Sequence, residues 1–136
     1  ASGLEGRVSL PGIVRGPQEW LGAGHVLVVS SRFEGFSNVV AEATCSGLPV
    51  VSFDCPYGPS EMIVEGRNGF LVPPGDVAAL AGAMTRLAAD PALRNRLGQA
   101  AHIAAARFEQ GRIMAQWDTV LGGAVQPRRA AMAWSS

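Results

Sequence analysis

The chain contains no lysine, since all eleven of its basic residues are arginine. This absence excludes a Walker-type phosphate loop, a Schiff-base site and a protein-kinase site, because each needs an ammonium group at a fixed position. Cysteine is scarce as well: Cys45 and Cys55 form no CxxC motif, and His25 and His102 form no cluster with them in sequence. The sequence therefore predicts two reduced thiols and no metal site.

Neither sign of charge is in excess, because eleven arginines balance eleven Asp and Glu residues and the net charge is +0. Such a chain has no electrostatic attraction for nucleic acid or for an anionic membrane. No apolar run approaches the ~20 residues of a membrane span, and the first residues lack the charged-then-apolar pattern of a signal peptide. With 136 residues, 48% of them hydrophobic, we expect one soluble, cytoplasmic domain with a hydrophobic core.

Short apolar runs alternate with helical patterns along the chain. We predict strands at Val8–Leu10, Val26–Val29, Val50–Phe53 and Phe70–Val72, the second of them buried on both faces. We predict helices at 17–21, 39–43, 59–64, 77–88, 91–108 and 113–121. Strands separated by helices pair in parallel, so the predicted fold is α/β, a partial doubly wound parallel sheet followed by C-terminal helices.

The C-terminal helices have predicted caps and buried faces. Asp76 and Asp90 are the predicted N-caps of the first two. Apolar positions predict a buried stripe on each helix: Val77, Leu80, Ala81, Met84, Leu87 and Ala88, then Leu93, Leu97, Ala100, Ala101, Ala104 and Phe108, then Ile113, Trp117, Val120 and Leu121. We expect one domain over residues 1–121 and a flexible tail over residues 122–136.

Ligands of doubly wound sheets bind at the carboxyl ends of the strands, and one such end is rich in polar residues. The segment Ser30–Asn38 joins a predicted strand to a helix that begins near Ser37. Unpaired amides at a helix N-terminus attract phosphate, and Gly35 lets the backbone come close to a ligand. The sequence therefore predicts an anion site here, with Ser37 as a helix cap or a hydrogen-bond donor rather than a nucleophile.

Two acids flank this predicted anion site. Glu34 precedes it, and Glu42 lies within the helix that follows. Five helical residues rise about 7.5 Å, and the loop adds to the separation. A glycosidase pair would lie about 5–9.5 Å apart and act on one bond, whereas here a helix N-terminus lies between the acids. The layout suits a long ligand with a central diphosphate and hydroxyl groups at both ends, such as a nucleotide sugar.

The segment EGFSNVVAE at residues 34–42 matches the E-x7-E motif of retaining GT-B glycosyltransferases. The chain as a whole resembles glycosyltransferase family 4, also called group 1. The supporting segments are LVVSSRFEGF at 27–36, ATCSGLPVV at 43–51, GPSEMI at 58–63 and NGFLVPPGD at 68–76. The resemblance, which runs from about Gly6 to Leu121, implies the Rossmann-like, donor-binding C-terminal half of a GT-B fold.

The resemblance implies a role for each residue of the motif. Glu34 contacts the donor sugar and is the catalytic candidate, Glu42 binds the ribose hydroxyls, and the diphosphate is held by the amides of Gly35, Phe36, Ser37, Asn38 and Val39. The implied reaction is a retaining transfer from a nucleotide sugar to a glycan or lipid-linked acceptor, without a metal. The implied location is cytoplasmic, at most peripheral to the inner membrane face. The segment FDCPYGPSE at 53–61 resembles members that use UDP-linked hexoses or N-acetylhexosamines in surface-polysaccharide synthesis.

The chain departs from the family in what precedes these segments. A complete GT-B enzyme has an acceptor-binding first domain, and the opening β-α units of its second domain supply the Arg and Lys that neutralise the leaving diphosphate. In a sheet of order 3-2-1-4-5-6, Val26–Val29 would lie beside Val50–Phe53 and next to Phe70–Val72, with Val8–Leu10 two places away and unpaired. Because an unpaired apolar edge favours aggregation, we expect an N-terminally truncated fragment or a chain that depends on another.

The sequence is compatible with more than one function. The first is the donor-binding part of a retaining glycosyltransferase. The second is a non-catalytic module that binds a nucleotide sugar or docks on a complete transferase, which the absence of lysine favours. An epimerase on the same type of sheet is a weaker third, and a phosphorylase is excluded because its cofactor binds lysine.

Overall fold

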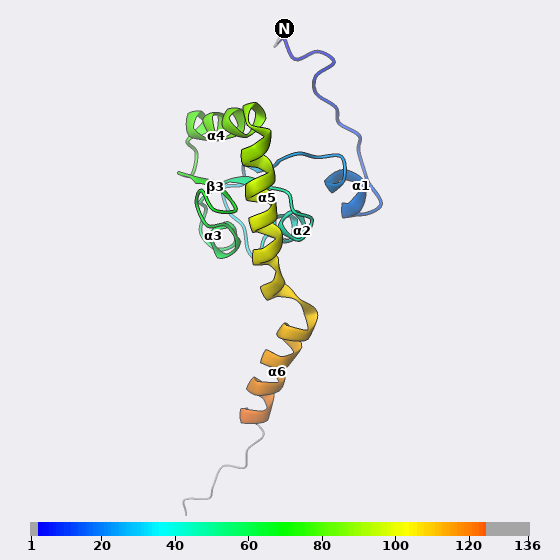
Figure 1. Cartoon of the computed structure of the whole chain (residues 1–136), viewed down its shortest axis with the longest axis vertical. Helices are drawn as coiled ribbons and strands as arrows, with labels where there is room; N and C mark the ends of the chain where they lie inside the picture. The colour runs from blue at the N-terminus through cyan, green and yellow to red at the C-terminus, as the bar shows by residue number, and fades with distance from the viewer. Residues whose placement is uncertain (1–2, 125–136) are drawn as a thin grey trace, which may run out of the picture. The chain divides into compact units, whose positions relative to one another are not determined.

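A computed structural model describes residues 3–124 of the chain (Figure 1). Its elements, in chain order, are α1 (Pro17–Leu21), β1 (Leu27–Val29), α2 (Asn38–Cys45), β2 (Val50–Phe53), α3 (Pro59–Met62), β3 (Gly69–Val72), α4 (Val77–Ala89), α5 (Pro91–Ala105), the 3-10 helix η1 (Ala106–Phe108) and α6 (Gln110–Ala124). The alternation of strands and helices confirms the predicted α/β class.

The three strands form one parallel sheet in the order β1-β2-β3, so that β2 lies in the centre. In this register Val51 of β2 lies between Val28 of β1 and Phe70 of β3. The prediction that β1 lies beside β2 is therefore confirmed. The predicted 4-5-6 order of these three strands is also confirmed, although β1 does not itself lie next to β3, because β2 separates the two.

Two further strand predictions are wrong. Val8–Leu10 forms no strand, and Val8 and Leu10 are 61% and 92% exposed, since no described strand offers their backbone groups a partner. The run Val26–Val29 is not buried on both faces: only Val29 is buried, because β1 lies at the edge of the sheet. All four residues of β2 are buried. The expectation that a continuous apolar run forms a strand buried on both faces therefore holds for the central strand and not for β1.

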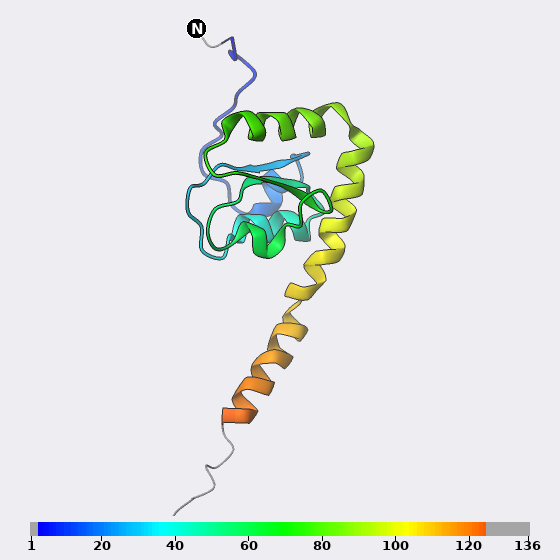
Figure 2. The ribbon, with the colours of Figure 1, turned by 90° about the vertical axis from the view of Figure 1, so that its left-hand side faces the viewer.

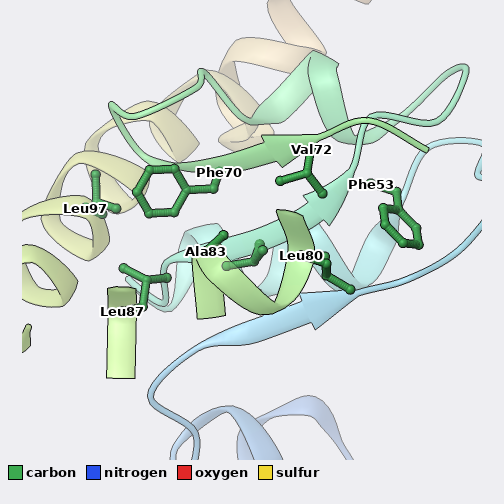
Figure 3. Close-up of a cluster of buried hydrophobic side chains, with 8 residues drawn as sticks. Phe53, Phe70, Val72, Leu80, Ala83, Leu87 and Leu97 are labelled. Atoms are coloured by element: carbon green, nitrogen blue, oxygen red, sulfur yellow. The ribbon is translucent and has the colours of Figure 1, made fainter. Parts of the chain in front are cut away.

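Helices cover both faces of the sheet. Figure 2 shows α4 across one face, with α2 and α3 on the other. Side chains alternate along a strand, so Phe53 of β2 and Phe70 of β3 lie on the face toward α4, where Leu80 and Leu87 pack against the same cluster (Figure 3). Burial of each such side chain contributes about 1.5–3 kcal/mol. This core fixes the strands whose carboxyl ends carry the predicted site.

The helix starts follow the sequence closely. The Oδ1 atom of Asp76 accepts a hydrogen bond of 2.9 Å from the amide of Ala79, and Oδ1 of Asp90 accepts one of 2.9 Å from Leu93. Both predicted N-caps are confirmed. Each satisfies an amide that the first turn of a helix leaves without a partner.

The predicted helix faces are only partly correct. On α4 the buried residues are Leu80, Ala83 and Leu87, while Val77 and Met84 are 70% and 42% exposed. The predicted Ala81 and Ala88 of α4 are exposed as well, and on α5 the buried residues are Leu97, Gly98, Ala101 and Ala105 rather than Ala100 and Ala104. On both helices the buried stripe is narrower than predicted and shifted toward Ala83 on α4 and toward Gly98 and Ala105 on α5.

The described residues divide into two compact units, 3–105 and 106–124. Within the second unit three residues of the predicted buried stripe of α6 are exposed, Trp117 at 56%, Val120 at 61% and Leu121 at 54%, while Ile113 is half-buried. The prediction of Trp117 as core is therefore wrong. Helix α6 runs to Ala124, and the rest of the predicted tail lies outside the described residues. Among residues 3–124, no helix combines the length and hydrophobicity that crossing a membrane requires.

Candidate functional site

The candidate site lies where two loops meet at the carboxyl ends of β1 and β2. The first loop, Ser30–Ser37, leads into α2, and the second, Asp54–Gly58, leads into α3. Gly58 joins them: a Cβ at this position would overlap the carbonyl oxygen of Gly35 and lie 3.2 Å from Cβ of Glu34. The second loop thus borders the site. It belongs to the segment 53–61 that resembles users of UDP-linked sugars, but none of its residues is among the predicted site residues.

A signal for this second loop is nevertheless present in the sequence. Tyr57-Gly58-Pro59 lies in the short loop after the buried strand β2, which ends at Phe53. Gly58 has a φ of 114°, which only glycine adopts readily. A glycine placed between a strand and a proline-initiated helix indicates a close backbone approach. The sequence does not show which segment Gly58 approaches.

Helix α2 begins with unpaired amides, as the sequence predicts. Ser37 is the N-cap residue, and its carbonyl oxygen accepts hydrogen bonds of 3.1 Å from the amides of Val40 and Ala41. The amides of Asn38 and Val39 precede these donors and have no acceptor within the helix. Together with the helix dipole they form a partially positive centre that favours an anionic group.

The side chain of Ser37 does not cap the helix, which corrects that part of the prediction. Its hydroxyl is buried, with the residue 1% exposed, and has no hydrogen-bond partner among the described residues. A buried hydroxyl without a partner costs about 1–3 kcal/mol.

The two carboxylates flank the helix start. Glu34 is half-buried in the first loop, and Glu42 is half-buried on α2, about 6 Å along the helix axis from Asn38. Within residues 3–124, neither carboxylate has a hydrogen-bond or ion-pair partner. Both are therefore available to accept hydrogen bonds from hydroxyl groups of a ligand.

The remaining predicted site residues lie in the same short segment. Gly35 is exposed, and a Cβ at this position would meet no atom within 4 Å, so the space above it is open. Phe36 is 58% exposed, Asn38 is exposed and Val39 is half-buried. Six of the seven predicted residues thus lie between the end of β1 and the first turn of α2, and Glu42 lies about one turn further along that helix.

A hollow of about 650 Å³ lies at the opposite end of the sheet, lined among others by His25, Cys45, Arg94 and His102. Its wall includes the last turn of α2, where Nδ1 of His102 lies 2.7 Å from the carbonyl oxygen of Cys45. Helix C-termini carry partial negative charge, and parallel sheets bind ligands at the other ends of their strands. We therefore assign the site to the loops rather than to this hollow.

Both cysteines are free thiols, as predicted: Cys45 is exposed and Cys55 is buried. In the part of the chain that the structure describes, no three His, Cys, Asp or Glu side chains gather closely enough to hold a metal ion.

Comparison with known proteins gives consistent matches. Residues 1–90 match the family described as glycosyl transferases group 1. An exopolysaccharide phosphotransferase of Streptomyces coelicolor is 39% identical over 118 residues, which cover 84% of this chain and 12% of that protein. The lipopolysaccharide core biosynthesis glycosyltransferase LpsE of Rhizobium meliloti is 37% identical over 100 residues, which cover 74% of this chain and 29% of LpsE.

A solved structure matches the fold. The crystal structure of HepE from Anabaena in complex with UDP has a TM-score of 0.83 at 30% identity, covering 89% of this chain and 34% of HepE. The complex of HepE with UDP-glucose matches with a TM-score of 0.80. These matches confirm the predicted Rossmann-like fold of the GT-B type. The chain spans 12% to 34% of the length of these three proteins.

Proposed function

The chain belongs to the glycosyl transferases group 1 family, and on this basis we propose that it binds the nucleotide-sugar donor for transfer to a glycan or lipid-linked acceptor. The observation that carries the proposal is the start of α2, where open amides and the buried, unpartnered hydroxyl of Ser37 lie between two free carboxylates. A diphosphate would accept hydrogen bonds from the amides and from that hydroxyl. Hydroxyl groups on either side of the diphosphate would donate to Glu34 and Glu42.

The proposed donor is a UDP-linked hexose or N-acetylhexosamine. Its support is the similarity to HepE, which was solved with UDP and with UDP-glucose, and the segment at residues 53–61. In this arrangement Glu34 contacts the sugar and Glu42 the ribose, with the diphosphate on the amides from Gly35 to Val39.

The proposed transfer retains the configuration of the sugar and is electrostatic in nature. The start of α2 would stabilise the negative charge that develops on the departing diphosphate, so that no metal is required. Glu34 would orient the sugar and stabilise its oxocarbenium-like centre. The acceptor would be held by residues outside this chain, because the chain spans only 12% of the length of the Streptomyces relative and 34% of the length of HepE. The reaction would take place in the cytoplasm or at the inner membrane face.

A second candidate is a non-catalytic module that binds the same donor. The absence of lysine favours it for the chain by itself, because no ammonium group is available to neutralise the leaving diphosphate. If this chain alone turns over the donor and Glu34→Ala abolishes that turnover, the non-catalytic module is excluded and the enzyme is supported.

The test of the proposed function is calorimetric titration of the chain with UDP, UDP-glucose and UDP-N-acetylglucosamine, together with two variants of Asn38. Asn38 is the first residue of α2, where proline is tolerated, so Asn38→Pro removes one amide donor and keeps the helix. Loss of a hydrogen bond to a charged group costs about 1.5–3 kcal/mol, so the affinity for UDP should fall about tenfold or more.

The matched control is Asn38→Ala, which keeps the amide and should bind UDP within about threefold of the original chain if the amide rather than the side chain holds the diphosphate. Absence of binding to every nucleotide tested would contradict the proposal. Equal affinities in the proline and alanine variants would contradict the assignment of the diphosphate to the start of α2.

A further inference from the structure

Tyr57 has a strained backbone that its own side chain does not explain. Among the described residues other than glycine, Tyr57 alone has a positive φ, of 61°. This conformation costs about 1–2 kcal/mol for a residue with a Cβ. The ring is 82% exposed, so packing of the tyrosine in the core does not offset that cost.

The strain is imposed by the neighbours of Tyr57. Gly58 packs against the carbonyl oxygen of Gly35 and lies next to Glu34, and Cys55 and Pro59 are buried on either side of the turn. The turn is thus fixed against the first loop of the site. Non-glycine residues held in a left-handed conformation by such surroundings occur preferentially at ligand sites.

Two further aromatic side chains are exposed at the same end of the sheet. Phe33 is 81% exposed and Phe36 is 58% exposed, and these residues stand directly before Glu34 and directly after Gly35. We call Phe33, Phe36 and Tyr57 the aromatic rim. Exposed aromatic side chains beside a free carboxylate provide an apolar surface and a hydrogen-bond acceptor together, which is the combination that a sugar ring with C–H faces and hydroxyl edges requires.

We propose that Tyr57 contacts the sugar ring of the nucleotide-sugar donor and thereby contributes to the choice of sugar. This inference rests on the proposed function, which assigns Glu34 to the donor sugar. A Cβ on Gly58 would lie 3.2 Å from Cβ of Glu34. Tyr57 precedes Gly58, so its ring is attached one residue from the point where the second loop meets the residue that would bind the sugar hydroxyls. The strained turn holds that attachment point in place before the donor arrives, which lowers the entropy lost on binding.

The experiment compares Tyr57→Asn and Tyr57→Phe with the original chain by calorimetric titration with UDP and with UDP-glucose. Asparagine tolerates the left-handed conformation, so Tyr57→Asn removes the ring and keeps the turn. We expect its affinity for UDP-glucose to fall about tenfold, as for loss of an aromatic contact in a binding site, with the affinity for UDP unchanged. Tyr57→Phe keeps the ring and should bind UDP-glucose within about threefold of the original chain.

Two outcomes would overturn the role of Tyr57. Unchanged affinity of Tyr57→Asn for UDP-glucose would show that the ring does not touch the donor sugar, as expected if it contacts the acceptor instead. An equal fall for UDP and UDP-glucose would show that the residue only maintains the loop. If the original chain binds neither compound, the proposed function itself is wrong and the inference falls with it.

Discussion

At the scale of single residues, Ser37 occupies the position of a helix cap, but its side chain does not act as one. Serine is a favoured N-cap because its hydroxyl accepts hydrogen bonds from the amides of the first turn. In this chain Ser37 occupies the cap position without making that bond, and its buried hydroxyl has no partner among the described residues. The amides of the first turn are thereby left open for an oxygen from outside the protein.

Glu34 and Glu42 are expected to act on different parts of the donor. Replacing Glu42 by glutamine should weaken UDP binding about tenfold, because ribose hydroxyls would lose a charged acceptor. Replacing Glu34 by glutamine should leave UDP binding nearly unchanged and weaken binding of UDP-glucose, because UDP lacks the sugar. Calorimetric titration of both variants with both compounds measures these four affinities.

The control for these substitutions is Glu109→Gln, an exposed residue outside the site, which should leave both affinities unchanged. If Glu34→Gln and Glu42→Gln weaken UDP by the same factor, the assignment of the two acids to opposite ends of the donor is wrong.

The sequence alone predicts the members of this site because they are close together in the chain. Glu34, Gly35 and Glu42 lie within one loop and two helical turns, so their relative positions follow from local geometry. Gly58 could not be identified in this way, because its contact with the first loop is formed between segments far apart in the sequence. Only the folded sheet brings the ends of β1 and β2 together.

At the scale of elements, the packing of α5 on α2 depends on glycine. A Cβ on Gly98 of α5 would overlap the carbonyl oxygen of Gly47, which follows α2. Gly47 itself has a φ of 72°, a conformation that favours glycine. This close approach holds the C-terminal end of the helix whose other end forms the candidate site.

We expect Gly98→Ala to destabilise the chain by about 1–3 kcal/mol, because overpacking outweighs the gain in helix propensity. Gly82→Ala is the matched control: Gly82 lies inside α4 and a Cβ there would meet nothing within 4 Å. That substitution should stabilise the chain by about 0.5–1 kcal/mol. Urea denaturation followed by circular dichroism measures both, and the same sign for the two would contradict the close helix contact.

Element boundaries follow from the sequence better than element environments do. Capping by Asp76 and Asp90 is local, and both caps are present. Burial of β1 and of the α4 face depends on which neighbours each element receives. An apolar run therefore predicts the strand at β1 correctly, but it cannot distinguish an edge position from a central one.

At the scale of the whole molecule, ligand binding should raise the thermal stability, because UDP is expected to bind the folded chain and not the unfolded one. At a UDP concentration of about 100 times Kd the added stability is about 2.7 kcal/mol, which raises Tm by about 10 °C for a protein of this size. Differential scanning fluorimetry measures the shift.

Asn38→Pro should show a clearly smaller rise in Tm at the same UDP concentration, since it binds more weakly. A rise of equal size in this variant, or none in the original chain, would be inconsistent with UDP binding at the start of α2.

The sequence by itself determined the alternation of strands and helices, the helix caps and the spacing of two acids around a helix start. All of these depend on interactions between residues a few positions apart, which the order of amino acids specifies directly. Only the tertiary structure decided that β1 lies at an edge, that α4 buries Ala83 while Val77 and Met84 stay exposed, and that Gly58 packs next to Glu34. These features depend on which distant segments pack together, because burial and close contact are properties of the folded neighbours rather than of the local sequence.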